Sequence, residues 1–306
     1  MKNSEYHEPV LVHEVIGYLR LDVPLKKQAY FVDTTVGTAG HTLEILKAGG
    51  SVLGIDADKE LLEIAEKRLN IACPTLNDSV QGHFKLVNGN FKDIDKIAKR
   101  MKFKKVDGIL FDLGVSNLHL KSQTRGFSFE NGFAPLDMRI DAKTQSVTGA
   151  DLLNSLRKDQ LIELFSSVMI QPVAKRLAKE VVFLRKERPI KETSDFLAII
   201  SRARIVSGKL NPATLPFMAL RMAVNSELEN LKIALPKALE LLKKGGRLVA
   251  ISFHSGEDAL VKNFFRNMQK KDLVKILTKK PVVPTREEII KNPRARSAKL
   301  RCFEKI

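Results

Sequence analysis

The chain has 306 residues, 44% of them hydrophobic, which is enough to bury one large core or two smaller ones. Lys and Arg number 52 against 35 Asp and Glu, so the formal net charge is +17, which favours a polyanionic partner over an acidic or neutral one. Two cysteines and the absence of an apolar run of ~18 residues argue against a disulfide-bonded secreted domain and against a membrane protein.

Short apolar runs alternate with helical patterns along most of the chain. Patterns of helical spacing cover His41–Lys47, Lys59–Leu69 and Leu215–Lys243. This alternation predicts an α/β fold with a parallel sheet, whose strands are buried on both faces and therefore read as continuous apolar runs. The predicted strands, in chain order, are Ala29–Val32, Ser51–Ile55, Phe84–Val87, Val106–Phe111 and Gly246–Phe253.

The regular alternation stops between Asp112 and Gly246. Amphipathic patterns within this gap predict an inserted helical domain, and Ser297–Phe303 predicts one further strand. We therefore predict a first part of the α/β domain at residues 1–140, the insertion at residues 141–212, and a second part at residues 213–306. The predicted helices of the insertion include Asp151–Leu156, Gln160–Phe165 and Ala174–Leu184.

A candidate cofactor site lies where the first, second and fourth predicted strands end. Asp33, Asp56 and Asp112 follow these strands, and the turn Gly37–His41 follows the first. Ligands of open α/β sheets bind at the carboxyl ends of the strands, and an acid after the second strand can accept both hydroxyl protons of a ribose. Glycines in the turn permit a close approach of backbone to ligand.

The composition of the turn separates two classes of cofactor. A dinucleotide needs G-x-G-x-x-G to seat its pyrophosphate on a helix N-terminus, but residue 39 is Ala and residue 42 is Thr. S-adenosylmethionine has no phosphate and does not need that fingerprint. The turn therefore favours S-adenosylmethionine over a nicotinamide cofactor, while ordinary loop glycines are the remaining interpretation.

The excess positive charge is concentrated in two stretches. Lys262–Ile306 holds 14 basic and 4 acidic residues, and Gln171–Leu210 holds 10 and 4. We expect these stretches to face RNA phosphates, with a solvated surface as the alternative. The residues predicted to bind RNA in the basic tail are Arg294, Arg296, Lys299 and Arg301.

The segment Arg125–Asp141 reads RGFSFENGFAPLDMRID and is too polar and too rich in Gly and Pro for a helix or strand. A long irregular segment after a cofactor strand is usually functional. Phe127 and Phe129 are candidates to stack on a splayed base, or else to anchor the loop in the core. Arg125 is a further candidate for RNA binding.

At this segment the chain resembles a known family, the bacterial 16S rRNA cytosine-N(4)-methyltransferases called RsmH or MraW. Similar stretches run nearly from end to end, in the family's order. They include His7–Leu11, Gly54–Asp56, Gly89–Phe91, Asp107–Ser116, Arg125–Asp141, Asn211–Thr214, Val224–Leu228, Ser252–Ser255 and Asn292–Ser297.

The resemblance implies a class I S-adenosylmethionine-dependent methyltransferase fold with the helical insertion in substrate recognition. It implies transfer of a methyl group to the exocyclic N-4 of a decoding-centre cytidine of 16S rRNA, within the small ribosomal subunit. Asp56 would hold ribose hydroxyls, Phe91 would line the adenine pocket, and His119 stands where the family usually has Gln. The cofactor residues that the resemblance implies are Ala39, Gly40, His41, Asp56, Phe91, Asp112 and His119.

Three residues are candidates for catalysis. We hypothesise that Asp137 accepts a hydrogen bond from the cytosine amine and that Arg139 fixes the nucleotide, because an acid and a base lie two residues apart in an irregular loop. The rival hypothesis is that these two side chains pair with each other and brace the loop. Asp112 is a third candidate that would instead serve the cofactor, and Asn225 and His254 are secondary ones.

A second class of function stays open. Val168–Gln171 stands where the family usually has Tyr-Gly-Glu-Glu, so an RNA-binding or ribosome-assembly protein that kept the fold and lost turnover is the alternative. Histidines and cysteines without paired spacing indicate no metal site, and the polar start Met1–Val10 contains no signal peptide. We therefore expect a cytoplasmic protein without a membrane partner, and nothing in the sequence indicates an oligomeric state.

Overall fold

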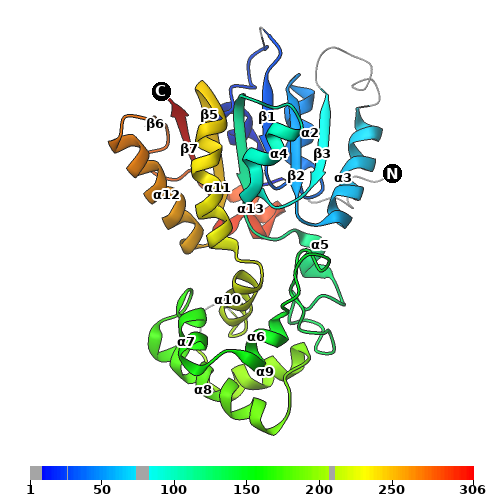
Figure 1. Cartoon of the computed structure of the whole chain (residues 1–306), viewed down its shortest axis with the longest axis vertical. Helices are drawn as coiled ribbons and strands as arrows, with labels where there is room; N and C mark the ends of the chain where they lie inside the picture. Colours follow the sequence, from blue (N-terminus) through cyan, green and yellow to red (C-terminus); the bar gives the residue numbers. More distant parts are fainter. Residues whose placement is uncertain (1–8, 26, 74–82, 207–210) are drawn as a thin grey trace. The chain divides into compact units, whose positions relative to one another are not determined.

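The structure is a computed structural model that describes residues 9–25, 27–73, 83–206 and 211–306. The chain divides into two compact units (Figure 1). The first comprises Met1–Gly114 and Leu228–Ile306, and the second comprises Val115–Glu227. Among the residues that the structure describes, no helix is both long enough and apolar enough to span a membrane.

The first unit is built on a seven-stranded sheet in the order β3-β2-β1-β4-β5-β7-β6. Neighbouring strands from β3 to β5 are parallel, and β7 runs antiparallel to both β5 and β6. This topology confirms the predicted α/β class and the class I methyltransferase fold that the resemblance implied. The strands are β1 (Tyr30–Asp33), β2 (Ser51–Asp56), β3 (Phe84–Asn88), β4 (Val106–Asp112), β5 (Leu242–Ser252), β6 (Val274–Ile276) and β7 (Lys299–Lys305).

Helices cover both faces of this sheet, as continuous apolar strands require. Alternate strand residues point to opposite faces, so Val32 and Leu53 join a core with α4, α11 and α12, whereas Phe31 and Val52 join a core with α1, α2 and α3. The helices are α1 (Val12–Tyr18), α2 (Gly40–Lys47), α3 (Lys59–Ala72), η1 (Phe91–Asp93), α4 (Ile94–Arg100), α11 (Glu227–Leu241), α12 (Ser255–Lys270), α13 (Arg286–Lys291) and η2 (Pro293–Ser297).

Two details of the secondary structure differ from the sequence prediction. The single helical pattern over Leu215–Lys243 is wrong, because Ser226 adopts a left-handed conformation (φ 49°) and separates α10 from α11. Strand β6 was not predicted, since its three residues form a strand only by pairing with β7. The further strand predicted at Ser297–Phe303 is confirmed as β7.

The second unit is helical and has a core of its own, which includes Phe165, Phe196 and Phe217. It is wider than the predicted insertion at residues 141–212, because Phe127 and Leu220 from the flanking segments belong to the same core. Neither flank has the charged helical pattern on which that prediction rested. The helices are α5 (Asn117–Lys121), α6 (Gly149–Ser155), α7 (Lys158–Ser166), α8 (Gln171–Glu187), α9 (Thr193–Arg202) and α10 (Thr214–Val224).

Candidate active site

Three carboxylates of the first unit lie at one edge of its sheet, as the sequence predicts. Asp33, Asp56 and Asp112 end β1, β2 and β4. Strand β1 pairs in parallel with both β2 and β4, so their carboxyl ends meet at the same edge. Ligands of such sheets bind outside these ends.

The turn after β1 is held by Asp56. The Asp56 carboxylate accepts hydrogen bonds from the backbone N–H of Gly37 (2.7 Å) and of Asp58 (2.9 Å). Gly37 has a positive φ of 54°, and buried Ala39 has φ 63° as the residue that precedes α2. A side chain on Gly40 would lie 3.1 Å from Pro9, which explains glycine there. The structure thus places Ala39 and Gly40 in a tight, strained turn beside Asp56.

Asp33 is buried inside this edge of the first unit. Its carboxylate accepts hydrogen bonds from the Thr42 hydroxyl (2.7 Å) and from the Thr35 backbone N–H (3.2 Å). Burial raises the pKa of Asp33 to about 6, although the Thr42 hydrogen bond acts in the opposite direction. Asp33 therefore ties β1 to the first turn of α2.

His41 and Asp112 approach each other at the same edge. The Nε2–H of His41 donates to the carbonyl of Val10 (2.9 Å), and Nδ1 lies 3.4 Å from Oδ2 of Asp112. Burial lowers the pKa of His41, so the imidazole is neutral at pH 7 and Nδ1 carries a lone pair. The contact is therefore not an ion pair. When Asp112 is protonated, its carboxyl group can donate a hydrogen bond to Nδ1 of His41.

Asp112 itself is prepared for a further partner. Burial, together with the charge of Glu257, raises the pKa of Asp112 to about 7. Its Oδ1 is buried and has no hydrogen-bond partner within the part of the chain that the structure describes. A buried acceptor without a donor is costly, so this oxygen fits a ligand that donates a hydrogen bond or carries positive charge.

Phe91 begins η1, three residues after the last residue of β3, and is partly exposed. The edge of its ring meets Phe111 with centroids 5.8 Å apart and an interplanar angle of 82°. This contact holds the ring against the core of the first unit while leaving apolar surface uncovered. The position is compatible with the adenine contact that the resemblance implies.

In the second unit, Asp137 and Arg139 are paired. Arg139 donates from Nε to Oδ1 (2.7 Å) and from Nη2 to Oδ2 (2.8 Å), and its backbone N–H donates to Oδ1 (3.1 Å). Burial opposes ionisation of Asp137, but the hydrogen bonds from Arg139 outweigh it and lower the carboxyl pKa below its ordinary value. Oδ1 is fully used by these donors, whereas Oδ2 keeps an accepting position.

Arg125 and His119 have structural partners in the second unit. Arg125 donates from Nη2 to the carbonyls of Arg139 (2.9 Å) and Ile140 (2.7 Å) and lies over the ring of Phe127. His119 is buried, accepts at Nδ1 from the Ser116 backbone N–H (3.1 Å), and packs its ring against Phe127. Arg125 braces the loop and His119 caps α5, and the RNA contact of Arg125 stays a prediction.

The two phenylalanines of the loop serve the core. Phe127 is buried, and Phe129 packs edge-on against Phe217 with centroids 5.6 Å apart. Of the two interpretations offered for these rings, anchoring of the loop is the one that the structure supports. A third phenylalanine of the same segment, Phe133, is 84% exposed and does not join this core.

The two secondary candidates stabilise helix ends. Asn225 follows α10; its amide donates to the Met138 carbonyl (2.8 Å), and its Oδ1 accepts from the Ile140 backbone N–H (2.9 Å). His254 precedes α12 and forms a capping box with Glu257, whose Oε2 accepts from the Phe253 N–H (2.8 Å). Asn225 thus holds the Asp137–Arg139 loop onto α10.

The basic tail divides into exposed and buried residues. Arg294 and Arg296 are exposed on η2, and Lys299 is partly exposed, with Nζ 3.9 Å from Asp258. Arg301 is only 7% exposed and forms two hydrogen bonds with Asp258 (2.6 and 3.1 Å). Arg301 thus already has a carboxylate partner, because strand alternation turns its guanidinium toward α12, and its RNA contact stays a prediction.

Sequence reasoning missed two hydroxyl residues of the site. Thr42 donates to Asp33, and the Thr35 hydroxyl accepts from the Asp112 backbone N–H (2.8 Å). The available signal was Thr34–Thr35 directly after a buried strand and Thr42 in the first turn of the next helix. Residues of this type often bridge strand ends by side-chain hydrogen bonds.

Known proteins resemble this chain over its full length. A ribosomal RNA small subunit methyltransferase H from Persephonella marina is 41% identical, covering 98% of this chain and 99% of that protein. The protein of the same name from Thermotoga neapolitana is 42% identical, covering 100% and 98%. A solved rRNA methylase from Streptococcus thermophilus gives a TM-score of 0.47 at 12% identity, covering 98% and 99% of the two chains, a similarity too low to support a shared function.

The family comparison covers almost every residue. Residues 4–306 match the MraW methylase family, and this range contains both units and all the carboxylates described above. This match and the identity to relatives along the whole chain together show the family. The chain belongs to the MraW methylase family.

Proposed function

We propose that this protein transfers a methyl group from S-adenosylmethionine to small-subunit ribosomal RNA, at N-4 of a decoding-centre cytidine of 16S rRNA. The observation that carries the proposal is the family match over residues 4–306, with relatives named for methylation of small-subunit ribosomal RNA. The buried oxygen of Asp112 at the strand edge, which has no partner among the described residues, supports the cofactor independently, since it calls for a donor or a cation.

The residues at the strand edge of the first unit fit S-adenosylmethionine. Asp56 would accept from the ribose hydroxyls, since it ends β2 at the strand edge and the backbone N–H groups of Gly37 and Asp58 fix the orientation of its carboxylate. Phe91 would cover the adenine, and Gly37 and Gly40 would allow backbone approach. Asp112 would hold the positively charged end of the donor.

Chemically, the bound donor supplies an electrophilic methyl group on a sulfonium centre. The protein has to orient the amine, because positioning supplies much of the rate of a displacement. The exocyclic amine of cytosine is a poor nucleophile, as its lone pair is delocalised into the ring, so an acceptor on an N–H would help it. We assign this acceptor to Oδ2 of Asp137, held in place by Arg139.

The proposed substrate also indicates partners and location. We propose that the RNA is presented within the small ribosomal subunit and that the protein acts in the cytoplasm, where that subunit is assembled. Exposed Arg294 and Arg296 on η2 are proposed phosphate contacts. The second unit, which holds Asp137, is the proposed substrate-recognition domain.

The test is transfer of tritiated methyl from S-adenosylmethionine to small subunits that lack the modification, followed by mass mapping of the labelled nucleotide. Label at N-4 of a decoding-centre cytidine is the expected result. Label elsewhere would refute the proposed target but keep the enzyme class. Cofactor binding without transfer to subunits or to naked 16S rRNA would instead favour the RNA-binding or assembly protein.

A further inference from the structure

A hollow of about 220 Å³ lies in the first unit, between α12 and the segment that follows β6. Its lining shares no residue with the Gly37–Gly40 turn or with Asp112. Apolar side chains of Phe265 and Ile276 line it together with basic side chains from α12 and from the loop after β6. The basic lining residues are Lys262, Arg266, Lys279 and Arg301.

Three of the four cations carry uncompensated charge. Arg301 is neutralised by its two hydrogen bonds with Asp258. Lys262, Arg266 and Lys279 form no ion pair with any residue that the structure describes. Three like charges around one hollow repel each other, so an anion would be favoured there.

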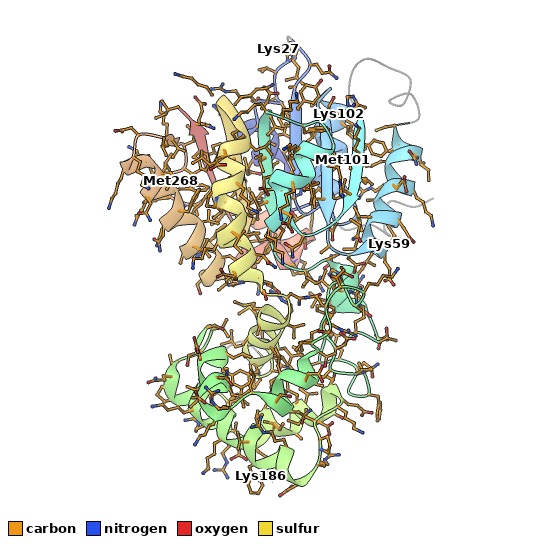
Figure 2. All side chains as sticks on the ribbon, viewed as in Figure 1. Lys27, Lys59, Met101, Lys102, Lys186 and Met268 are labelled. Carbon is orange, nitrogen blue, oxygen red and sulfur yellow. The ribbon has the colours of Figure 1, made fainter. Side chains whose placement is uncertain are left out.

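The walls of the hollow are held by packing and hydrogen bonds. The side of α12 that includes Met268 packs on the core of the first unit (Figure 2), and Phe265 meets Phe303 edge-on with centroids 4.6 Å apart. Gln269 accepts a hydrogen bond from the Ile276 N–H (3.0 Å), which ties α12 to β6. Buried Thr278 accepts from the Cys302 N–H (2.9 Å). A cation site with fixed walls needs little reorganisation to bind.

The arrangement of the cations suits a polymer better than a small ion. Three basic residues at intervals of four positions form one row along a face of α12: Lys262, Arg266 and Lys270. At this spacing, the Cβ atoms of neighbouring residues in the row are about 5–6 Å apart. Lys279, from the loop after β6, lines the same hollow as Lys262 and Arg266. An open row of cations matches successive phosphates of a nucleic-acid strand, whereas a small anion would be held by a closed cage.

We propose that this hollow binds backbone phosphates of the ribosomal RNA substrate, as a second RNA contact apart from the catalytic loop. The inference rests on the proposed function, since it assigns that substrate to the site. The segment Lys262–Ile306 is also the most basic part of the chain, with 14 basic and 4 acidic residues. Its charge would steer the RNA and position it without reading bases.

The test compares two double variants with the same change in charge. Lys262→Gln/Lys279→Gln removes two cations of the hollow. Lys271→Gln/Lys275→Gln removes two exposed cations of the same segment that do not line it, and Lys275 points away from Ile276 because strand residues alternate. Binding of a 16S rRNA fragment is measured by fluorescence anisotropy from 0.05 to 0.5 M salt, with no turnover required.

The hollow variant should lower the salt slope of RNA binding by about 1.4, at ~0.7 per phosphate contact, and weaken binding on the order of 10-fold near 0.15 M salt. The control should change the slope by less than half as much. Equal slopes for the two variants would overturn the proposal. S-adenosylmethionine binding, unchanged in both, verifies that they are folded.

Acetylation footprinting identifies the ligand. The RNA should protect Lys262 and Lys279 but not Lys275, and 10 mM inorganic phosphate alone should protect none of them. Protection by phosphate but not by RNA would mean a small-anion site and overturn the proposal. A wild-type protein that binds RNA through the hollow but never methylates it would refute the proposed function and leave the hollow intact as an RNA contact.

Discussion

One carboxylate in each unit shows how different the hydrogen-bond partners and the pKa of an aspartate are in the two parts of the molecule. Asp112, at the strand edge of the first unit, has a buried oxygen without a partner among the described residues and a pKa raised to about 7. Asp137, in the loop of the second unit, is held by two side-chain hydrogen bonds from Arg139, and its pKa is lowered. The first has an oxygen that no described residue satisfies and that suits a ligand, whereas the second already has its cation.

This difference separates two kinds of preorganisation. An unsatisfied buried oxygen stores an unfavourable free energy that a cationic or donating ligand relieves on binding. A paired carboxylate organises its own loop and stays ionised over a wide pH range, so it can orient a substrate N–H without a change of protonation. We expect cofactor binding to be sensitive to pH and substrate orientation to be insensitive.

The largest effect is expected at Asp137. Asp137→Asn should lower kcat for methyl transfer about 100-fold or more, the magnitude typical of losing a positioned acceptor, while S-adenosylmethionine binding is kept. Arg139→Gln is the matched variant, because it breaks the same pair from the other side. If the pair only braces the loop, both variants will lose thermal stability and kcat in equal measure, and the catalytic role fails.

A second expectation concerns the turn after β1. Asp56→Asn should weaken S-adenosylmethionine binding about 10- to 100-fold in calorimetry, because a charge-assisted hydrogen bond contributes about 1.5–3 kcal/mol. Asp58→Asn is the control, since Asp58 accepts from the Glu60 N–H at the start of α3 and Asn caps helices equally well. Equal losses in the two variants would remove Asp56 from the cofactor site.

Asn225 connects α10 to the Asp137–Arg139 loop in the second unit. Asn225→Ala should lower the free energy of unfolding by about 1–3 kcal/mol in urea titration, because the Ile140 N–H and the Met138 carbonyl lose their partner. Asn267→Ala, at an exposed position of α12, is the control and should change it by less than about 0.5 kcal/mol. An unchanged free energy of unfolding in Asn225→Ala would show that the loop holds its shape without this contact to α10.

The smallest expected effect is the pH dependence of cofactor binding. A carboxyl with a pKa of about 7 is mostly protonated at pH 6 and mostly ionised at pH 8, so affinity for the cationic donor should rise about 10-fold over this range. Asp112→Asn should flatten the profile. A wild-type profile that is flat between pH 6 and 8 would contradict the assignment of Asp112 to the donor's positive end.

Much of the first unit was accessible from the sequence. The five predicted strands and the strand at Ser297–Phe303 are present because buried parallel strands must be continuously apolar. The three strand-end acids were found for the same reason, since a polar residue that ends such a run has to lie at the sheet edge. The bounds of the second unit differ from those predicted for the insertion, because Phe127 joins its core from an irregular loop and Leu220 joins it from α10, both outside the charged helical stretch on which the prediction rested.

The partners of individual charges were beyond the sequence. Arg125 and Arg301 read as basic residues available to RNA, but Arg125 donates to loop carbonyls and Arg301 pairs with Asp258, 43 positions away. Ion pairs and hydrogen bonds at such separations depend on which elements become neighbours. Local patterns hold no information on this, because any of several acids could meet a given arginine.

By itself, the sequence determined the α/β class, the edge of the sheet at which Asp33, Asp56 and Asp112 lie, and the family to which the chain belongs. These follow from hydrophobic periodicity and from motifs that are local in the chain. Only the tertiary structure decided that no described residue satisfies one oxygen of Asp112, that Asp137 is paired, and that Lys262 and Lys279 border one hollow. Burial and charge pairing arise when distant segments pack together, and they set which groups remain available to a ligand.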